Sequence, residues 1–259
     1  MNRRNFLFAT AMTLVAAASH VSAADAPKDT KCYELRVYYA PEGKLDALHA
    51  RFRDHTMKLF VKHGITNIGY WTPLENPDRK LYYILSYPSR EARATSWKEF
   101  QADPDWKAAA SASEKDGKLV AKVESTFLHT TDYSMEVKPA IGTEPRIFEL
   151  RTYTCTPNNL KLLDARFRDH TIKLFSKHGM SHFGYWHLDA KQPGADDTLV
   201  YLLAHKSKEA SEASFKAFRA DPDWVKAKEA SEKEGGGSLT IPDGVKSVLL
   251  TPTDYSPTK

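Results

Sequence analysis

The chain has 259 residues, enough for one or two domains, and its 41% content of hydrophobic residues is typical of a globular protein. Its 37 basic and 33 acidic residues give a net charge of +4, and two of the excess cations, Arg3 and Arg4, lie at the N-terminus. The other charges are mixed in sign, and no basic run alternates with aromatic residues, which excludes the usual pattern of a protein that binds nucleic acid or an anionic membrane.

Residues 1–23 are predicted to be a cleavable export signal, because a basic start is followed by an apolar stretch and by small residues around Ala23. Arg3 and Arg4 stand just before Phe6, a pattern typical of a bacterial twin-arginine signal. An ordinary secretory signal is the alternative. The apolar stretch is too short and too rich in Ala and Thr for a stable membrane span, so we expect a periplasmic or secreted protein.

The rest of the chain is a duplication. "RFRDHTMKLFVKHG" at residues 51–64 recurs as "RFRDHTIKLFSKHG" at 166–179, with twelve of the fourteen positions identical. Further pairs, such as "FQADPDW" and "FRADPDW", extend the match over both halves. A segment rich in Pro, Gly and charged residues lies between them. We therefore predict repeat 1 at residues 31–133, a linker at 134–145 and repeat 2 at 146–256.

Each repeat is predicted to contain strands and helices in the order β-α-β-β-α-β, the ferredoxin-like unit. Apolar residues alternate where a strand is expected and recur at helical spacing where a helix is expected. Gly64 should end the first helix, while Ser89 and Asp103 are typical N-caps of later helices. In repeat 1 the expected elements are a strand at 32–39, a helix at about 42–63, strands near 65–72 and 80–87, helices after Ser89 and Asp103, and a strand at about 122–130.

One such unit has helices on one face of its sheet and leaves the other face bare. That face would expose Tyr, Trp and Leu side chains and must be covered. Two units in one chain can cover each other, sheet face against sheet face. The predicted fold is therefore α+β, with two tandem ferredoxin-like units forming a pseudo-twofold α+β barrel.

The segments "YELRVY", "KHGI", "GYW" and "ADPDW", most of them present again in the second copy, resemble the NIPSNAP family. The resemblance covers nearly the whole chain after the export signal. It implies a dimeric α+β barrel fold and says little about function. Related barrel families include cofactor-independent monooxygenases and haem enzymes, but a shared fold does not by itself carry an activity.

Polar residues on the first strand of each repeat are the first candidate site. Glu34, Arg36 and Tyr38 alternate with Leu35 and Val37, and the repeat reproduces the polar set as Glu149, Arg151 and Tyr153. If the apolar residues face the helices, the polar ones face the barrel interior, where a Glu–Arg pair could orient a ligand. A ladder of ion pairs that holds the two sheets in register is the alternative.

A histidine on the first helix of each repeat is the second candidate. His55 and His170 follow Arg51 and Arg166 by four residues, which places each pair on one side of a regular α-helix. We expect a neutral histidine that hydrogen-bonds at the helix–sheet interface. A general base or a haem ligand is the alternative, and haem is the cofactor that this alternative would require.

Aromatic residues form the third candidate. Side chains along a strand alternate between the two faces of the sheet. This alternation places four aromatic residues on the bare face: Trp71 and Tyr83, and their copies Trp186 and Tyr201. There they could stack on a flat apolar ligand or simply fill the barrel.

Metal-binding spacings such as His-x-His or Cys-x-x-Cys are absent from the sequence, and we predict no metal. His182, His187 and His205 are expected to be unpaired surface residues. Cys32 and Cys155 occupy non-equivalent positions and are expected to be free, semi-buried thiols, with a disulfide as the alternative.

The sequence therefore favours an exported protein that binds a small, partly apolar ligand or a protein partner in its barrel, without a predicted cofactor. Assembly into a homo-oligomer stays open. The alternative function is that of a cofactor-independent monooxygenase or a haem-dependent oxidoreductase of the barrel type.

Overall fold

The computed structural model describes residues 29–142 and 144–259. The predicted export signal at residues 1–23 lies outside the described residues. Within the described part, no helix is both long enough and apolar enough to cross a membrane.

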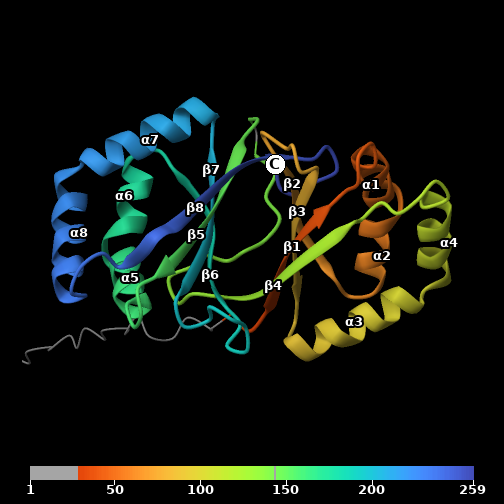
Figure 1. Ribbon diagram of the computed structural model, residues 1–259, viewed down its shortest axis with the longest axis horizontal. Helices are drawn as coiled ribbons and strands as arrows, with labels where there is room; N and C mark the ends of the chain where they lie inside the picture. Colours follow the sequence, from red (N-terminus) through yellow and green to blue (C-terminus); the bar gives the residue numbers. More distant parts are fainter. Residues whose placement is uncertain (1–28, 143) are drawn as a thin grey trace, which may run out of the picture.

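The two halves contain the same series of elements, shown in Figure 1. The first half consists of β1 (Cys32–Tyr39), α1 (Leu45–Arg51), the π-helical turn η1 (Phe52–Thr56), α2 (Met57–Lys62), β2 (Thr66–Pro73), β3 (Lys80–Tyr87), α3 (Arg90–Ala102), α4 (Pro104–Ser113) and β4 (Lys122–Thr130). The second half consists of β5 (Ile147–Cys155), α5 (Leu160–Arg166), η2 (Phe167–Thr171), α6 (Ile172–Lys177), β6 (Ser181–Leu188), β7 (Thr198–His205), α7 (Lys208–Ala220), α8 (Pro222–Glu234) and β8 (Thr240–Pro252).

The strands close into one antiparallel barrel in the order β1-β3-β2-β8-β5-β7-β6-β4. Each half supplies four neighbouring strands, and the halves join where β2 pairs with β8 and β4 pairs with β6. The helices of each half cover its own side of the barrel, so the molecule has two helical layers with the barrel between them (Figure 1). The predicted fold of two ferredoxin-like units in a pseudo-twofold α+β barrel is confirmed. Closure also leaves neither half with a free sheet edge.

The barrel interior is filled by apolar side chains from both halves. Trp71 and Phe148 lie 5.4 Å apart between ring centroids, and Trp186 lies 6.0 Å from Tyr33. Each tryptophan packs on a glycine of its own strand, next to a bulge. A Cβ added at Gly69 would fall 2.1 Å from the indole of Trp71, so glycine is needed for this close approach.

The first helix of each half is interrupted by a π-helical turn. The backbone N–H of Met57 donates to the carbonyl of Phe52, five residues earlier, and the Thr56 hydroxyl donates to the carbonyl of Arg51 at 3.1 Å. The longer turn shifts the following side chains around the helix axis. Consequently Thr56 lies on the buried side together with Arg51, and His55 is exposed. The second half repeats this arrangement.

The predicted helix ends are confirmed. Gly64 and Gly179 follow the first helices with φ of +72° and +78°, a conformation that suits glycine. Asp103 caps α4 by accepting from the N–H of Asp105 at 2.8 Å, and it also contacts His63 at 2.6 Å. His63 therefore links the end of one helix to the start of another.

The segments that follow β4 and β8 cross between the halves. Arg53 of the first half donates two hydrogen bonds to Asp254 at 2.7 and 2.8 Å, and Arg168 of the second half does the same to Asp132 at 2.9 and 2.8 Å. These bidentate pairs add a reciprocal contact to the two strand junctions.

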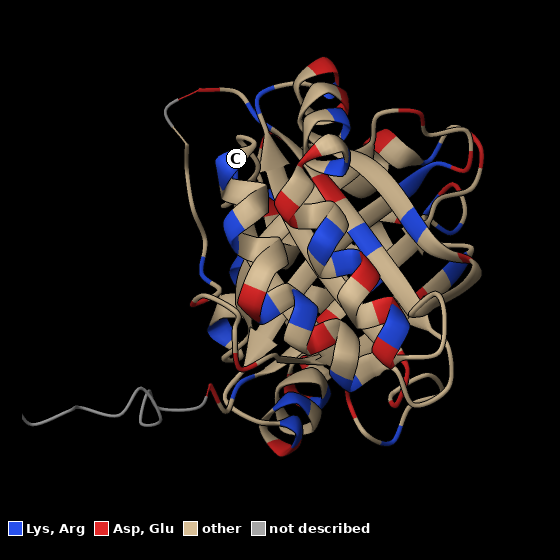
Figure 2. Ribbon diagram, turned by 90° about the vertical axis from the view of Figure 1, so that its left-hand side faces the viewer, with Lys and Arg blue, Asp and Glu red and all other residues tan. Residues whose placement is uncertain are grey.

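On the surface of the second half, charges of both signs are interspersed over the helices (Figure 2).

Candidate functional site

The polar residues of β1 and β5 face the helices, so the predicted direction was wrong. Tyr33 and Val37 belong to the barrel core, whereas Tyr38 packs with the helix-side core and Glu34 is contacted from α3. Glu149, Arg151 and Tyr153 follow the same pattern on β5. Both faces of this sheet are buried, and the barrel interior is the more apolar of the two. The apolar residues of the strand therefore face the interior, and the polar residues face the helices.

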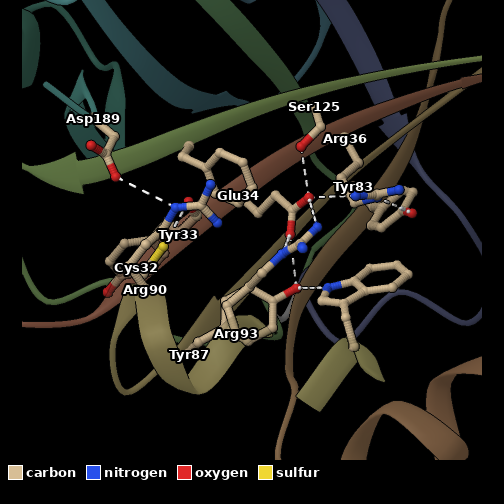
Figure 3. A network of polar contacts seen from close by, with 12 residues as sticks. Cys32, Tyr33, Glu34, Arg36, Tyr83, Tyr87, Arg90, Arg93, Ser125 and Asp189 are labelled. Carbon is tan, nitrogen blue, oxygen red and sulfur yellow. Dashed lines mark hydrogen bonds and ion pairs between the residues drawn. The ribbon is translucent and has the colours of Figure 1, made fainter. Parts of the chain in front are cut away.

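Glu34 lies at the centre of a buried polar cluster (Figure 3). Its carboxylate accepts hydrogen bonds from Arg36, from Arg93 at 2.9 Å to each oxygen, from Ser125 at 2.6 Å and from Tyr87 at 3.0 Å. Burial alone would raise the pKa of Glu34, but the bond from Arg93 and the charge of Arg36 lower the pKa to about 2. Glu34 is therefore a charged structural anchor between the sheet and α3.

Glu149, the equivalent residue of the second half, has a different set of partners. It accepts from Arg151 at 2.5 Å, from Ser211 at 2.8 Å and from Ser247 at 2.6 Å. His205 Nε2 lies 3.1 Å from the carboxylate without the alignment of a hydrogen bond. Ser211 occupies the position of Arg93, so the second cluster contains one guanidinium fewer than the first.

A pocket opens beside each cluster, between the outer face of the sheet and the helices. The first has a volume of about 300 Å³ and is lined by residues that include Arg36, Arg51, Phe52, Trp97, Trp106 and Glu114. The second has a volume of about 400 Å³ and is lined at the equivalent positions by Arg151, Arg166, Phe167, Phe215, Trp224 and Glu232. The duplication has thus kept a pocket in both halves.

In both pockets a buried arginine lies over an indole. The guanidinium carbon of Arg51 is 5.3 Å from the ring centroid of Trp106, and that of Arg166 is 5.1 Å from Trp224. Arg51 also donates to Glu114 at 2.8 Å. Arg166 donates to the hydroxyl of Ser231 at 3.2 Å and forms no ion pair with a carboxylate of the described residues. A carboxylate therefore balances the charge of Arg51 in the first pocket, whereas no carboxylate of the described residues pairs with Arg166 in the second.

The aromatic candidates are divided between the two sides of the sheet. Trp71 and Trp186 lie in the barrel interior, as predicted, and their buried indole N–H groups find no acceptor within the described chain. Tyr83 and Tyr201 lie on the helix side, so their predicted position was wrong. β3 and β7 alternate regularly, and both of their faces are buried, so the alternation alone did not show which face is the inner one.

The histidine candidates are outside both pockets. His55 and His170 are exposed, and their predicted contact at the helix–sheet interface was wrong because the π-helical turn replaces each by the following threonine. The expectation for the second-half histidines was also wrong. His187 lies 2.9 Å from Asp164, His182 lies 2.6 Å from Tyr185, and His205 is only 3% exposed.

Cys32 and Cys155 are free thiols, and both are buried. Burial raises the pKa of Cys32 to about 11 and that of Cys155 to about 12, which disfavours the reactive thiolate form of both. Over residues 29–142 and 144–259, no three or more His, Cys, Asp or Glu residues are grouped so that they could hold a metal ion.

Some residues of the site gave no clear signal in the sequence. Arg93 is separated from Glu34 by 59 residues, and no local pattern links them. Trp106 and Trp224 each stand in a helix-start motif, which by itself gives no sign of a pocket. Their equivalence across the repeat, together with that of Arg51 and Arg166, is the signal that could have indicated a shared pocket.

Solved structures with the same architecture support the fold. A candidate monooxygenase from Lactobacillus acidophilus NCFM is 13% identical, with a TM-score of 0.52 over 86% of this chain and 94% of that protein. A candidate monooxygenase from Fusobacterium nucleatum is 12% identical, with a TM-score of 0.54 over 86% and 92%. A candidate chlorite dismutase is 14% identical, with a TM-score of 0.52 over 87% and 96%. At these identities the likeness concerns the fold alone.

The sequence comparison is more specific. No curated protein matches the chain closely enough to count as a relative. The sequence model of the NIPSNAP family, however, matches residues 33–135 and 148–257, which is one complete match in each half. The chain therefore belongs to the NIPSNAP family, with two NIPSNAP domains in tandem.

Proposed function

We propose that this protein is an exported, non-catalytic binding protein that holds a small, partly apolar molecule between its sheet and its helices. The observation that carries the proposal is the pair of equivalent pockets, each with a buried arginine over an indole. A polar anchor surrounded by aromatic walls is typical of a small-molecule site, and volumes of 300 and 400 Å³ fall at the lower end of such sites.

The proposed location differs from the barrel interior that the sequence suggested. The interior is occupied by a continuous apolar cluster that includes Trp71, Trp186 and Phe148. A packed core of this kind leaves little room for a ligand. The helix-side pockets, in contrast, combine space with side chains that can recognise a polar group.

Export is part of the proposal, and the motif around Arg3 and Arg4 supports it. The twin-arginine route is tested by replacing both residues with lysine and following the precursor in a bacterial host. We expect unprocessed protein to accumulate in the cytoplasm. Normal processing of that variant, or normal export in cells without the translocase, would exclude this route.

The oxidoreductase alternative gains no support from the pocket residues. No histidine lines either helix-side pocket, so neither offers an imidazole to haem iron. An absorbance spectrum of the purified protein tests this directly. A Soret or flavin band would favour the alternative over the binding function.

The binding function is tested with two probes of the same shape, 2-naphthoate and the neutral 2-naphthamide, by isothermal titration calorimetry. We expect saturable binding of at least one probe. Replacing Trp106 and Trp224 together by alanine should weaken binding about tenfold, since each indole supplies aromatic contact area. Val61→Ala, at a surface position that is 65% exposed, is the matched control. Absence of binding for both probes would contradict the proposed function.

A further inference from the structure

The two pockets differ in the partners of their first arginine. In the first half, Arg36 Nε donates to the hydroxyl of Tyr83 at 2.8 Å, which satisfies both groups. In the second half, Arg151 Nε and the hydroxyl of Tyr201 are both buried and have no hydrogen-bond partner within the described chain. Buried polar groups without partners are rare in proteins, and Arg151, which lines the second pocket, therefore keeps a donor that its counterpart Arg36 has already used.

The second arginine shows the same contrast. Arg51 and Arg166 are 6% and 7% exposed, and the Nε of each lacks a partner. The charge of Arg51 is nevertheless balanced by Glu114, which lies 2.8 Å away. Arg166, in contrast, donates only to the neutral hydroxyl of Ser231. Burial lowers the pKa of its guanidinium, and the charge of Glu232 opposes this only in part. A buried cation without a paired anion is an unfavourable arrangement that a bound anion would relieve.

One difference between the repeats lies beside the missing ion pair. Ala110 of α4 is replaced at the equivalent position of α8 by Lys228, whose ammonium group binds Glu232 at 2.8 Å. Glu232, the counterpart of Glu114, is thereby held by the lysine instead of the arginine. Arg219, which replaces Gln101, adds another cation to the pocket lining.

We infer that the second pocket binds a small organic carboxylate, one per chain, and that the first pocket is closed to anions by its own glutamate. This inference rests on the proposed binding function and names the class of ligand. The carboxylate accepts from the guanidinium of Arg166 over the indole of Trp224, where a planar cation and a planar anion form strong, charge-assisted hydrogen bonds. The apolar part of the ligand lies against Phe167, Phe215 and Phe218, which line the same pocket.

The test compares 2-naphthoate with its neutral analogue 2-naphthamide by calorimetry. We expect one 2-naphthoate per chain, bound at least about tenfold more tightly than the amide, because only the anion compensates Arg166. Arg166→Gln should remove this preference while Arg51→Gln, its counterpart in the other half, leaves it unchanged. Thermal melts of both variants establish that they are folded.

Two substitutions on the helices test the inference without altering a buried arginine. Lys228→Ala should free Glu232 to pair with Arg166 and weaken 2-naphthoate binding about tenfold. Ala110→Lys should draw Glu114 away from Arg51 and raise the stoichiometry from one to two 2-naphthoate molecules per chain.

The outcomes separate this inference from the proposed function. Equal affinity for the two probes, or a loss caused by Arg51→Gln and not by Arg166→Gln, would overturn the inference and leave a binding protein of another specificity. An unchanged affinity in Lys228→Ala would also overturn it. If neither probe binds, the proposed function fails as well.

Discussion

Replacing Glu34 by glutamine should destabilise the protein by about 3–5 kcal/mol, the cost of leaving buried charges without their partner. The Glu34 side chain is completely buried, and it compensates both Arg36 and Arg93. Glutamine keeps the shape of the side chain but removes the negative charge. Both guanidinium groups then lose their counter-ion, Arg36 in a buried position and Arg93 in a half-buried one.

The pKa of Glu34 gives an independent estimate. Its fall from the ordinary value of 4.5 to about 2 corresponds to roughly 3 kcal/mol of stability. Because the pKa is lower in the folded state, this stability is fully present above pH 4.5 and is lost as the pH falls towards 2. The free energy of unfolding of the parent protein should therefore decrease over this pH range, and less so in Glu34→Gln.

Urea denaturation at pH 7 and at a series of lower pH values measures both effects. Glu149→Gln is the matched control and should cost less, because it leaves only one arginine unpaired, although the pKa of Glu149 is also lowered to about 2. Arg93→Ser introduces the residue that the second half has at this position. Added to Glu34→Gln, it removes one of the two unpaired cations and should recover part of the lost stability. A cost below about 1 kcal/mol for Glu34→Gln, with an unchanged pH profile, would refute the reasoning.

Three further predictions follow from burial and strand pairing. His55→Ala and His170→Ala should each change the free energy of unfolding by less than about 0.5 kcal/mol in denaturant melts, because both side chains are exposed. A larger loss of stability would show that the histidines have a structural role. Cys32 and Cys155 should react with a thiol reagent at pH 8 only after unfolding, because burial raises the pKa of both, and rapid labelling of the native protein would contradict this. The halves at residues 29–133 and 146–259, expressed separately, should dimerise or aggregate in light scattering, because β2 and β4 lose their partners β8 and β6, whereas stable monomeric halves would disprove it.

The fold could be predicted because its determinants are local and occur twice. Alternating apolar residues marked the strands, and Gly64, Ser89 and Asp103 marked the helix boundaries. The duplication then supplied the missing cover for the second face of each sheet. Local patterns do not reveal which of two buried faces is the inner one, and that is why Glu34 and Arg36 were placed on the wrong side.

The candidate site depends on contacts between residues far apart in the sequence. Glu34 can be fully buried only because Arg93 reaches it from α3, and Arg51 is compensated by Glu114 from the end of α4. The π-helical turn was likewise invisible to a pattern of 3.6 residues per turn, so His55 was assigned the inward position that Thr56 occupies. The polar residues of the site could thus be recognised from the sequence, but their partners could not.

The structure explains why a polar string is present twice. Within "RFRDHT", the first arginine faces the pocket, the phenylalanine enters the helix-side core, and the threonine hydroxyl closes the π-helical turn on the carbonyl of that first arginine. The second arginine, Arg53 or Arg168, binds an aspartate of the opposite half, Asp254 or Asp132. Four of the six positions therefore have a defined contact in each copy, and nothing in the structure explains the aspartate and the histidine.

This division of roles indicates how the two halves could diverge without loss of the fold. The π-helical turn and the crossed Arg–Asp pairs are identical in both copies, because each maintains the helix packing or the junction between halves. The changes from Arg93 to Ser211 and from Ala110 to Lys228 lie on helices that cover the pockets. The lysine alters the charge of one pocket lining, and the serine alters the cluster around Glu149, without touching a strand pairing or a helix cap. A tandem chain can therefore specialise one pocket while the other keeps its internal ion pairs, which a symmetric dimer of identical chains cannot do.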